Sequence, residues 1–469
     1  MMKDPLHYLS VPRQTGAVVP AAERVTQFKE VQARQGEEVR EDQAKRCLDC
    51  GTPYCQWKCP LHNAIPRWLE LAAEGRITDA AELAHQTNPL PEVCGRVCPQ
   101  DRLCESVCTL NDEFGAVTIG QVERDIADLA LDAGWRPDLS FVAKTGFKVA
   151  VIGAGPAGIG CADLLVRNGV EVTLYEAEAS IGGLLVTGIP GFKLEKDIVA
   201  RRFEVLKDMG VNFVLGTSVG KDIDFKAILD SHDAVFLGLG APRSVDSGLE
   251  GSEAQGCLEA AHYLYDQNLK LMQDTSLHFD QLGKKVVVIG GGDTAMDCSR
   301  TALRQGADSV TLLYRRDRAN MPGSPKEVRF AEEEGLKFAF CHQPLAVLTE
   351  DGKVTGIRVQ ETMLGAPDAS GRRRPEPVPG SERDLEADTV ILALGFRPQL
   401  PAWLSELGVV ADEAGRVLAP DGRTLHPKIF AGGDMVLGAD LVVTAIANGR
   451  KAAMGILAKL GVTAGVTAA

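Results

Sequence analysis

An apolar strand followed by a glycine-rich turn and a helix occurs twice in this chain, and this repeat constrains the fold more than any other feature. The first copy runs from the strand KVAVI at 148–152 into the turn GAGPAG at 153–158. A second strand, at 171–175, is followed by Glu176. In such a unit the first glycine permits the turn, the second lets the backbone approach a pyrophosphate, and the acidic residue accepts hydrogen bonds from ribose hydroxyls. The pattern predicts a Rossmann-like site for FAD or NAD.

The second copy differs from the first at the position of the acidic residue. Its strand, KVVVI at 285–289, leads into the turn GGGDTA at 290–295. Arg315 and Arg316 stand where the first copy has Glu176. A carboxylate there would repel the 2′-phosphate of NADP, whereas guanidinium groups bind it through charge-assisted, bidentate hydrogen bonds. A solvated surface pair is the alternative for two adjacent arginines, but their offset from the turn favours an NADPH site.

Three further segments indicate how two nucleotide-binding domains share the chain. Apolar strands at 233–241 and 388–395 have glycines at their ends, and the segment IFAGGD at 429–434 precedes an apolar helix at 441–460. This last arrangement resembles flavoproteins with two dinucleotide-binding domains. We expect an α/β fold in which the NADPH-binding domain is inserted into a discontinuous FAD-binding domain. Residues 141–469 contain no Cys-x-x-Cys pair, which excludes disulfide reductase chemistry.

Most of the cysteines are concentrated in the N-terminal part of the chain. Eight of the twelve form two groups, the first Cys47, Cys50, Cys55 and Cys59 and the second Cys94, Cys98, Cys104 and Cys108. Disulfides, structural zinc and iron–sulfur clusters are the three interpretations, and the spacing by itself favours clusters over zinc only modestly. A flavin without a dithiol partner needs another exit for its electrons, and one-electron clusters supply one. The combination therefore favours iron–sulfur.

Residues 1–140 are expected to form a small α-helical domain. The segments 38–46 and 65–84 have helical patterns, and the apolar core of the domain would be thin, so metal centres would contribute much of its folding free energy. The other four cysteines, Cys161, Cys257, Cys298 and Cys341, are isolated and are interpreted as small buried apolar residues.

Charge and hydropathy exclude two classes of partner. The 469 residues carry a net charge of −14, so a nucleic-acid binder is not expected, because phosphate attraction requires a surplus of cations. The most apolar stretch, 149–166, contains glycine, proline and an aspartate, and we expect it to be a buried strand, turn and helix and not a membrane span. No apolar secretory segment follows Met1, so we expect a cytoplasmic protein.

The combination of motifs resembles the family of the small (β) subunit of NADPH-dependent glutamate synthase, and also the N-terminal part of dihydropyrimidine dehydrogenase. The resemblance covers about residues 25–460 and rests on the two cysteine groups, the two glycine-rich turns and the segments CGRVCP at 94–99, GIPGFK at 188–193, GGGDTAMD at 290–297 and AGGD at 431–434. It implies FAD, NADPH and two [4Fe-4S] clusters with interleaved ligands.

The cluster ligands follow from the resemblance alone. One cluster would take Cys47, Cys50, Cys55 and Cys108, and the other would take Cys59, Cys98, Cys104 and a residue that is not cysteine. The dehydrogenase has a glutamine there, and the matching position in this chain is Glu123. Cys94 stays open as the alternative fourth ligand. An oxygen ligand in place of a thiolate changes the potential and lability of a cluster.

The resemblance also supplies candidate nucleotide-binding residues. For FAD they are Gly153, Gly155, Pro156, Ala157, Gly158, Glu176, Gly183, Leu184, Gly433 and Asp434. For NADPH they are Gly290, Gly291, Gly292, Asp293, Thr294, Ala295, Arg315, Arg316 and Gly395. We expect Asp293 and Thr294 to cap the second helix, and Lys193 and Lys326 to be solvated surface lysines. No side chain is assigned as a catalytic acid or base, because hydride transfer needs apposition of two cofactor rings.

The implied function is that of an electron-input subunit. NADPH would reduce FAD, and single electrons would pass through the clusters to a large (α) subunit that makes glutamate from 2-oxoglutarate and glutamine, in a hetero-oligomer. One alternative is the flavin and iron–sulfur subunit of a ferredoxin-dependent, NADP-linked bifurcating oxidoreductase, and another is a zinc-containing NADP-sensing module without catalysis. The expected division is 1–142 for the clusters, 143–242 and 396–469 for FAD, and 243–395 for NADPH.

Overall fold

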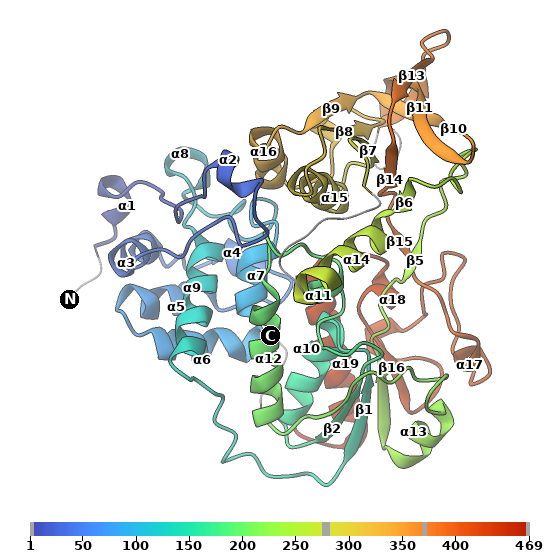
Figure 1. The fold of residues 1–469 in the computed structure, drawn as a ribbon. Coiled ribbons are helices and arrows are strands. Elements are labelled where there is room, and N and C mark those ends of the chain that lie inside the picture. The colour runs from blue at the N-terminus through green and yellow to red at the C-terminus, as the bar shows by residue number, and fades with distance from the viewer. Residues whose placement is uncertain (1–3, 274–281, 368–372, 466–469) are drawn as a thin grey trace.

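The protein consists of a helical N-terminal part and two sheet-containing parts (Figure 1). The structure is a computed structural model that describes residues 4–273, 282–367 and 373–465. Within these residues, no helix combines the length and the apolar composition that a membrane crossing requires.

The N-terminal part contains nine helices among its described residues and no named strand. They are α1 (His7–Ser10), α2 (Ala21–Arg24), α3 (Glu37–Lys45), α4 (Tyr54–Lys58), α5 (Ile65–Ala73), α6 (Ile77–Thr87), α7 (Pro91–Val97), α8 (Asn111–Phe114) and α9 (Ile119–Asp132). The helix expected over 65–84 is in fact two helices. Gly75 has a φ of +73°, in the left-handed region that ends a helix, and it separates α5 from α6.

The first nucleotide-type sheet is built from both ends of the remaining chain. Its strand order is β16-β4-β1-β2-β3, all parallel. Residues before position 240 supply β1 (Lys148–Ile152), α10 (Pro156–Val166), β2 (Glu171–Tyr175), α11 (Leu184–Thr187), α12 (Lys196–Asp208), β3 (Asn212–Val214), α13 (Phe225–Ser231) and β4 (Ala234–Leu237). The C-terminal residues supply α17 (Ala402–Ser405), η2 (Pro420–Gly422), β16 (Ile429–Ala431), α18 (Asp434–Leu437) and α19 (Val442–Leu460). This sheet is therefore discontinuous in sequence, as expected.

The second nucleotide-type sheet lies between those two portions of the chain. Its strands run in the order β6-β14-β7-β8-β9 and are parallel. Its elements are β6 (Cys257–Glu259), α14 (Ala260–Gln273), β7 (Lys285–Ile289), α15 (Asp293–Arg304), β8 (Ser309–Tyr314), η1 (Arg318–Asn320), α16 (Pro325–Glu333), β9 (Lys337–Phe340) and β14 (Thr389–Leu392). The antiparallel pair β5 (Arg243–Ser244) and β15 (Phe396–Arg397) forms the two crossings between the sheets.

An antiparallel sheet extends from the inserted part and was not expected from the sequence. It contains β10 (His342–Glu350), β11 (Lys353–Pro367), β12 (Arg373–Pro377) and β13 (Arg383–Glu386). Buried and exposed residues alternate along much of β11, as in a strand with one face on the core and one in water. The sheet lies at the outer end of the molecule, away from the N-terminal helices (Figure 1).

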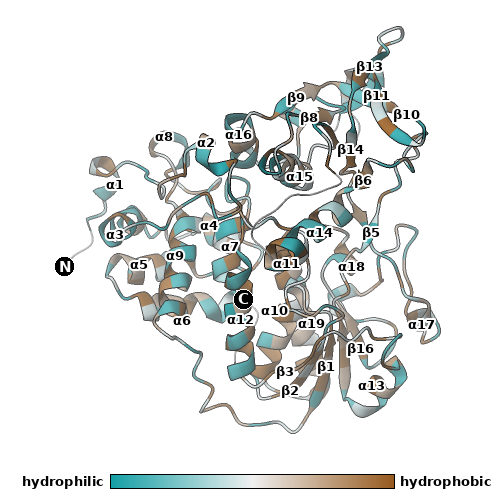
Figure 2. Ribbon diagram, in the orientation of Figure 1, coloured by the Kyte–Doolittle hydropathy of each residue, from teal (hydrophilic) through white to brown (hydrophobic). Residues whose placement is uncertain are grey.

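One apolar core joins the N-terminal helices to the first sheet. Trp68 and Leu69 of α5 belong to the same cluster of buried side chains as Val149 and Val151 of β1 and Ile446 of α19. Figure 2 shows apolar residues gathered on β1, β2, α10 and α19. The apolar core of residues 1–140 is thus continuous with that of the first sheet, against which these helices bury part of their apolar faces.

Close packing between α10 and α19 closes the discontinuous unit. A Cβ added at Gly449 would lie 2.0 Å from the carbonyl oxygen of Ala157, and one added at Gly160 would lie 2.9 Å from the carbonyl oxygen of Ile446. Both helices thus use glycine where one backbone touches the other. Gly449 was not singled out from the sequence, since a glycine within an apolar helix does not reveal its neighbour.

We predict that Gly449→Ala destabilises the protein. The added methyl group would overlap the backbone of α10, and overpacking of this kind costs about 1–3 kcal/mol or more. Thermal unfolding followed by calorimetry should give a lower Tm. Gly465→Ala is the matched control, because Gly465 is exposed and no atom lies within 4 Å of an added Cβ. Equal Tm values for the two variants would contradict the prediction.

Candidate functional site

The first glycine-rich turn is shaped for close approach by a ligand. Gly153 has a φ of +96°, and a Cβ added there would lie 2.4 Å from the carbonyl oxygen of Gly238. Gly155 is the N-cap of α10, and a Cβ added there would meet nothing within 4 Å. Gly153 is therefore required for packing within the protein. Gly155 leaves open space at a helix N-terminus, where a pyrophosphate binds favourably.

The acidic residue after β2 is held against this turn. Glu176 is buried, and its Oε2 accepts a hydrogen bond from the backbone N–H of Ala154 at 2.7 Å. Its Oε1 accepts from the N–H of Glu178 at 3.0 Å. The carboxylate is thus oriented beside the turn, as a ribose-binding acid in a dinucleotide fold must be.

The remaining FAD candidates gather at the same end of the sheet. A Cβ added at Gly183 would lie 3.2 Å from the Cα of Gly155, and one added at Gly433 would lie 2.7 Å from the Cβ of Ala157. The N–H of Gly433 donates to Oδ1 of Asn448, a partner that the sequence did not suggest. Burial raises the pKa of Asp434 to about 6. Three segments distant in sequence converge on one turn, and their geometry fits FAD.

The second turn repeats this geometry in the inserted part. A Cβ added at Gly290 would lie 2.4 Å from the carbonyl oxygen of Ala393, whereas Gly292, the N-cap of α15, is open. The expectation that Asp293 and Thr294 cap this helix was wrong. The N-cap is a glycine with no side-chain cap bond, and Oδ1 of Asp293 instead accepts from the N–H of Ser324 at 2.9 Å.

The two arginines after β8 differ in their surroundings. Arg315 is exposed, and its guanidinium makes no hydrogen bond within the described residues. Arg316 donates from Nε to the carbonyl oxygen of Arg373 at 3.1 Å. Nearby, Arg318 is paired with Glu332. Arg315 is thus the arginine of the pair with its donors available, and Arg316 is partly engaged by the protein.

Four cysteines from both groups line one small cavity. Cys47, Cys50, Cys55 and Cys108 surround it, and its volume is about 30 Å³. Burial and the neighbouring Cys47 raise the pKa of the Cys55 thiol to about 12. Crowded, half-buried thiols ionise readily when a cation compensates their charge, which is the role of iron in a cluster. The donor set fits the first predicted cluster.

The second predicted ligand set also lies together. Burial raises the pKa of Cys59 to about 12, and the carboxylate of Glu123 contributes to that rise. A hydrogen bond with Cys94 and burial raise the pKa of Cys98, and the carboxylate of Glu123 raises it further. Burial and Glu105 raise the pKa of Cys104, and Glu123 again adds to the rise. These groups therefore lie within electrostatic reach of one another. Their donor set, three thiols and one carboxylate, fits a second cluster.

The isolated cysteines match their interpretation only in part. Cys161 and Cys298 are buried, whereas Cys257 and Cys341 are partly exposed. Cys341 has a φ of +56° and directly follows β9. For these two positions the interpretation as buried apolar residues was wrong.

The two lysines expected at the surface belong instead to the contact between the three parts. Nζ of Lys193 pairs with Asp297 of α15 at 2.9 Å and lies 4.0 Å from Glu327 of α16. Burial lowers the pKa of Lys193, but these carboxylates outweigh it and raise the pKa above its ordinary value. Nζ of Lys326 donates to Oε1 of Gln32 at 3.0 Å. The surface interpretation was wrong for both, because sequence spacing does not reveal contacts between domains.

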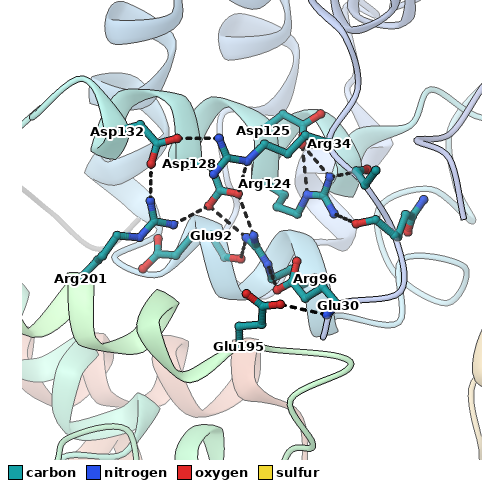
Figure 3. A network of polar contacts seen from close by, with 12 residues as sticks. Glu30, Arg34, Glu92, Arg96, Arg124, Asp125, Asp128, Asp132, Glu195 and Arg201 are labelled. Atoms are coloured by element: carbon teal, nitrogen blue, oxygen red, sulfur yellow. Dashed lines mark hydrogen bonds and ion pairs between the residues drawn. The ribbon is translucent and has the colours of Figure 1, made fainter. Parts of the chain in front are cut away.

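A cavity of about 340 Å³ lies where the three parts meet. Its lining includes Arg96, Cys98, Lys193, Asp293 and Lys326. Figure 3 shows the ion network beside it, in which Arg96 meets Asp128 of α9 and Glu30 of the N-terminal segment. Arg96 stands between Cys94 and Cys98, so this network fixes the backbone that carries a predicted cluster ligand.

Comparison with known proteins assigns the chain to a family. Residues 24–135 match the family described as dihydropyrimidine dehydrogenase domain II, 4Fe-4S cluster, and residues 147–449 match pyridine nucleotide-disulphide oxidoreductase. The chain is 53% identical to the glutamate synthase [NADPH] small chain of Escherichia coli (strain K12), over 97% of this chain and 99% of that protein. The chain belongs to the glutamate synthase [NADPH] small-chain family. The Azospirillum brasilense small chain is 47% identical, over 93% of this chain and 92% of that protein.

Membership of the small-chain family decides between the metal interpretations. The match of residues 24–135 to a 4Fe-4S domain favours iron–sulfur over zinc. FprA from Mycobacterium tuberculosis in complex with NADPH shares the fold of the nucleotide-binding parts, with a TM-score of 0.58 and 19% identity, over 67% of this chain and 85% of that one. The predicted fold class is confirmed.

A half-buried lysine lies between α11 and α12. Lys196 is the first residue of α12, and its Nζ donates to the carbonyl oxygens of Leu185 and Ile189, at 3.1 Å for the former. Burial lowers its pKa from 10.5 to about 7. The amine thus ties α11 to α12 from a site that disfavours its charge.

We predict that Lys196 makes stability rise with pH above neutrality. Between about pH 7 and 10.5 the unfolded chain binds a proton at this lysine and the folded protein does not, so the free energy of unfolding increases with pH. The Tm difference between wild type and Lys196→Met should therefore grow in favour of wild type from pH 7 to pH 9.5. Lys207→Met, at an exposed position on the same helix, should run parallel to wild type. A constant difference for Lys196→Met would contradict the shift.

Proposed function

We propose that this chain oxidises NADPH and delivers the electrons singly to a large subunit, as the electron-input chain of glutamate synthase. The large subunit would make glutamate from 2-oxoglutarate and glutamine. The observation that carries the proposal is the packing of a thiol-rich helical part directly against a flavoprotein fold, through one continuous core, in a member of the small-chain family.

The chain's own residues supply binding and orientation. The open N-terminus of α10 with Glu176, Gly183, Gly433 and Asp434 would hold FAD. The corresponding N-terminus of α15 with Arg315, Arg316 and Gly395 would hold NADPH. When bound, the flavin accepts a hydride and the iron–sulfur clusters carry single electrons. No acid or base side chain is needed, because positioning of the two rings supplies the catalysis.

The metal ligands follow from the two thiol sets. We assign Cys47, Cys50, Cys55 and Cys108 to one [4Fe-4S] cluster, in agreement with their shared cavity. We assign Cys59, Cys98, Cys104 and Glu123 to the other, and this assignment is supported by their mutual electrostatic influence.

The cellular location and the assembly of the chain are proposed from the same chemistry. Cysteines that hold iron–sulfur clusters must stay reduced, which suits a reducing compartment, so we propose a cytoplasmic location. We propose that the chain forms a hetero-oligomer with the large subunit. Within the chain, we propose that residues 1–142 hold the clusters, residues 143–242 and 396–469 bind FAD, and residues 243–395 bind NADPH.

We predict that Arg315→Asp reverses the preference for NADPH over NADH. The variant replaces a free guanidinium with a carboxylate that repels the 2′-phosphate, and one lost charge-assisted contact is worth about 1.5–3 kcal/mol, or roughly tenfold to over a hundredfold in kcat/KM for NADPH. Arg318→Asp, at a nearby arginine already paired with Glu332, should leave the coenzyme preference unchanged. Unaltered discrimination in Arg315→Asp would refute the phosphate assignment.

The proposed function is tested with the purified holoprotein under anaerobic conditions. NADPH should bleach the flavin absorption at about 450 nm and produce the electron paramagnetic resonance signal of a reduced cluster, while the chain without a large subunit makes no glutamate. Protein that contains zinc and no iron, or iron that stays oxidised, would overturn the proposal. Co-purification with a small flavoprotein instead of a large glutaminase-containing chain would favour the bifurcating oxidoreductase.

A further inference from the structure

The carboxylate of Glu123 is held by one of its two oxygens. The residue is buried on α9, and its Oε1 accepts hydrogen bonds from Nδ2 of Asn63 at 2.8 Å and from Nδ2 of Asn88 at 3.0 Å. Within the described residues no hydrogen bond reaches Oε2. A buried carboxylate with both donors on one oxygen keeps the lone pairs of the other available for a cation.

The two asparagines are themselves fixed in orientation. Oδ1 of Asn63 accepts from Nε1 of Trp68 at 3.1 Å and from Oγ1 of Thr87 at 3.0 Å. These donors require an oxygen there, so the nitrogen end of Asn63 is directed at Glu123.

The second asparagine is fixed in the same way from another segment. Oδ1 of Asn88 accepts from the N–H of Leu90 at 3.0 Å, which directs Nδ2 at Glu123. Asn63 and Asn88 are 2% and 1% exposed. Their side chains come from two loops that flank α5 and α6. Two buried, preoriented donors thus meet on one oxygen atom.

We propose that Asn63 and Asn88 are positioning residues that hold Oε1 of Glu123 so that Oε2 binds iron in the cluster of Cys59, Cys98 and Cys104. This inference rests on the proposed function, which assigns Glu123 as a ligand. Carboxylates that bind metals are commonly held by hydrogen bonds in this way, and loss of such a partner weakens metal binding by about 10–100-fold.

The position of Cys94 agrees with this arrangement. Its buried Sγ lies 3.7 Å from Oδ1 of Asn88 and donates to it. Cys94 therefore contacts the acceptor end of the same asparagine whose donor end holds Glu123. Its thiol therefore adds to the orientation of the amide.

Asn88→Asp in the full chain is the decisive variant. It keeps the size of the side chain and the oxygen that accepts from Leu90, but it replaces the donor to Glu123 with a second acceptor. Asn63→Asp makes the same change at the other position. Asn212→Asp, at an exposed position on β3, is the matched control.

Iron content, FAD content and the electron paramagnetic resonance spectrum of the dithionite-reduced protein are measured after exposure to a chelator. We expect the control to keep about eight irons per chain and both cluster signals. Asn88→Asp and Asn63→Asp should lose the second cluster roughly tenfold faster or more, falling toward about four irons, with FAD and the first signal retained. Iron and spectra unchanged in both variants would overturn the inference. Loss of FAD together with all iron in both would also overturn it, because the amides would then serve the fold.

Two further variants separate this inference from the ligand assignment on which it rests. If Glu123→Ala keeps about eight irons and both signals while Cys94→Ser falls to about four, the ligand is Cys94 and the assignment in the proposed function fails. If Glu123→Ala loses the second cluster and the asparagine variants do not, the ligand assignment holds and the positioning role alone is wrong.

Discussion

The buried carboxylate of Asp128 joins the parts of this protein. It accepts hydrogen bonds from Nε of Arg34 at 3.1 Å, Nη2 of Arg96 at 2.7 Å and Nη2 of Arg201 at 3.0 Å, which come from three different segments (Figure 3). Burial by itself would raise the pKa of Asp128, but the guanidinium groups outweigh it and hold the pKa below its ordinary value. Removal of Asp128 would leave the buried guanidinium of Arg96 without one of its two carboxylate partners. The loop that carries Cys98 is thereby held against the flavoprotein fold, and an electron path through both depends on that contact.

A second buried ion network does the same for the inserted domain. Arg300 and Arg304 of α15 share Glu334, whose pKa they lower to about 2 against the opposing effect of burial. Both guanidinium groups lie over the ring of Phe192, at 4.5 and 4.0 Å from its centroid. Arg24 of the N-terminal segment approaches Glu334 as well, at 3.6 Å. The inserted part is thus attached to both other parts through guanidinium groups removed from water, where such interactions are strong and geometrically demanding.

Much of the nucleotide-binding architecture could be predicted from local sequence. The strands at 148–152, 171–175 and 285–289 have the predicted bounds, because a parallel strand buried on both faces is a short, continuous apolar run. The antiparallel sheet β10–β13 was missed, since its half-exposed strands carry many charged residues and resemble loops. The break at Gly75 was missed because one glycine is tolerated in many helices, and its positive φ is visible only in the structure.

The sequence by itself determined which chemical groups this chain carries: two groups of cysteines and two glycine-rich turns, one followed by a carboxylate and the other by arginines. Each of these motifs consists of residues close together in the sequence. Backbone sterics and side-chain charge are therefore enough to interpret it. Tertiary structure alone decided which groups meet, including Glu123 with Asn63 and Asn88, Lys193 with Asp297, and Gly449 with Ala157. The physical reason is that burial brings together residues tens to hundreds of positions apart, and each contact depends on the packing of the whole core.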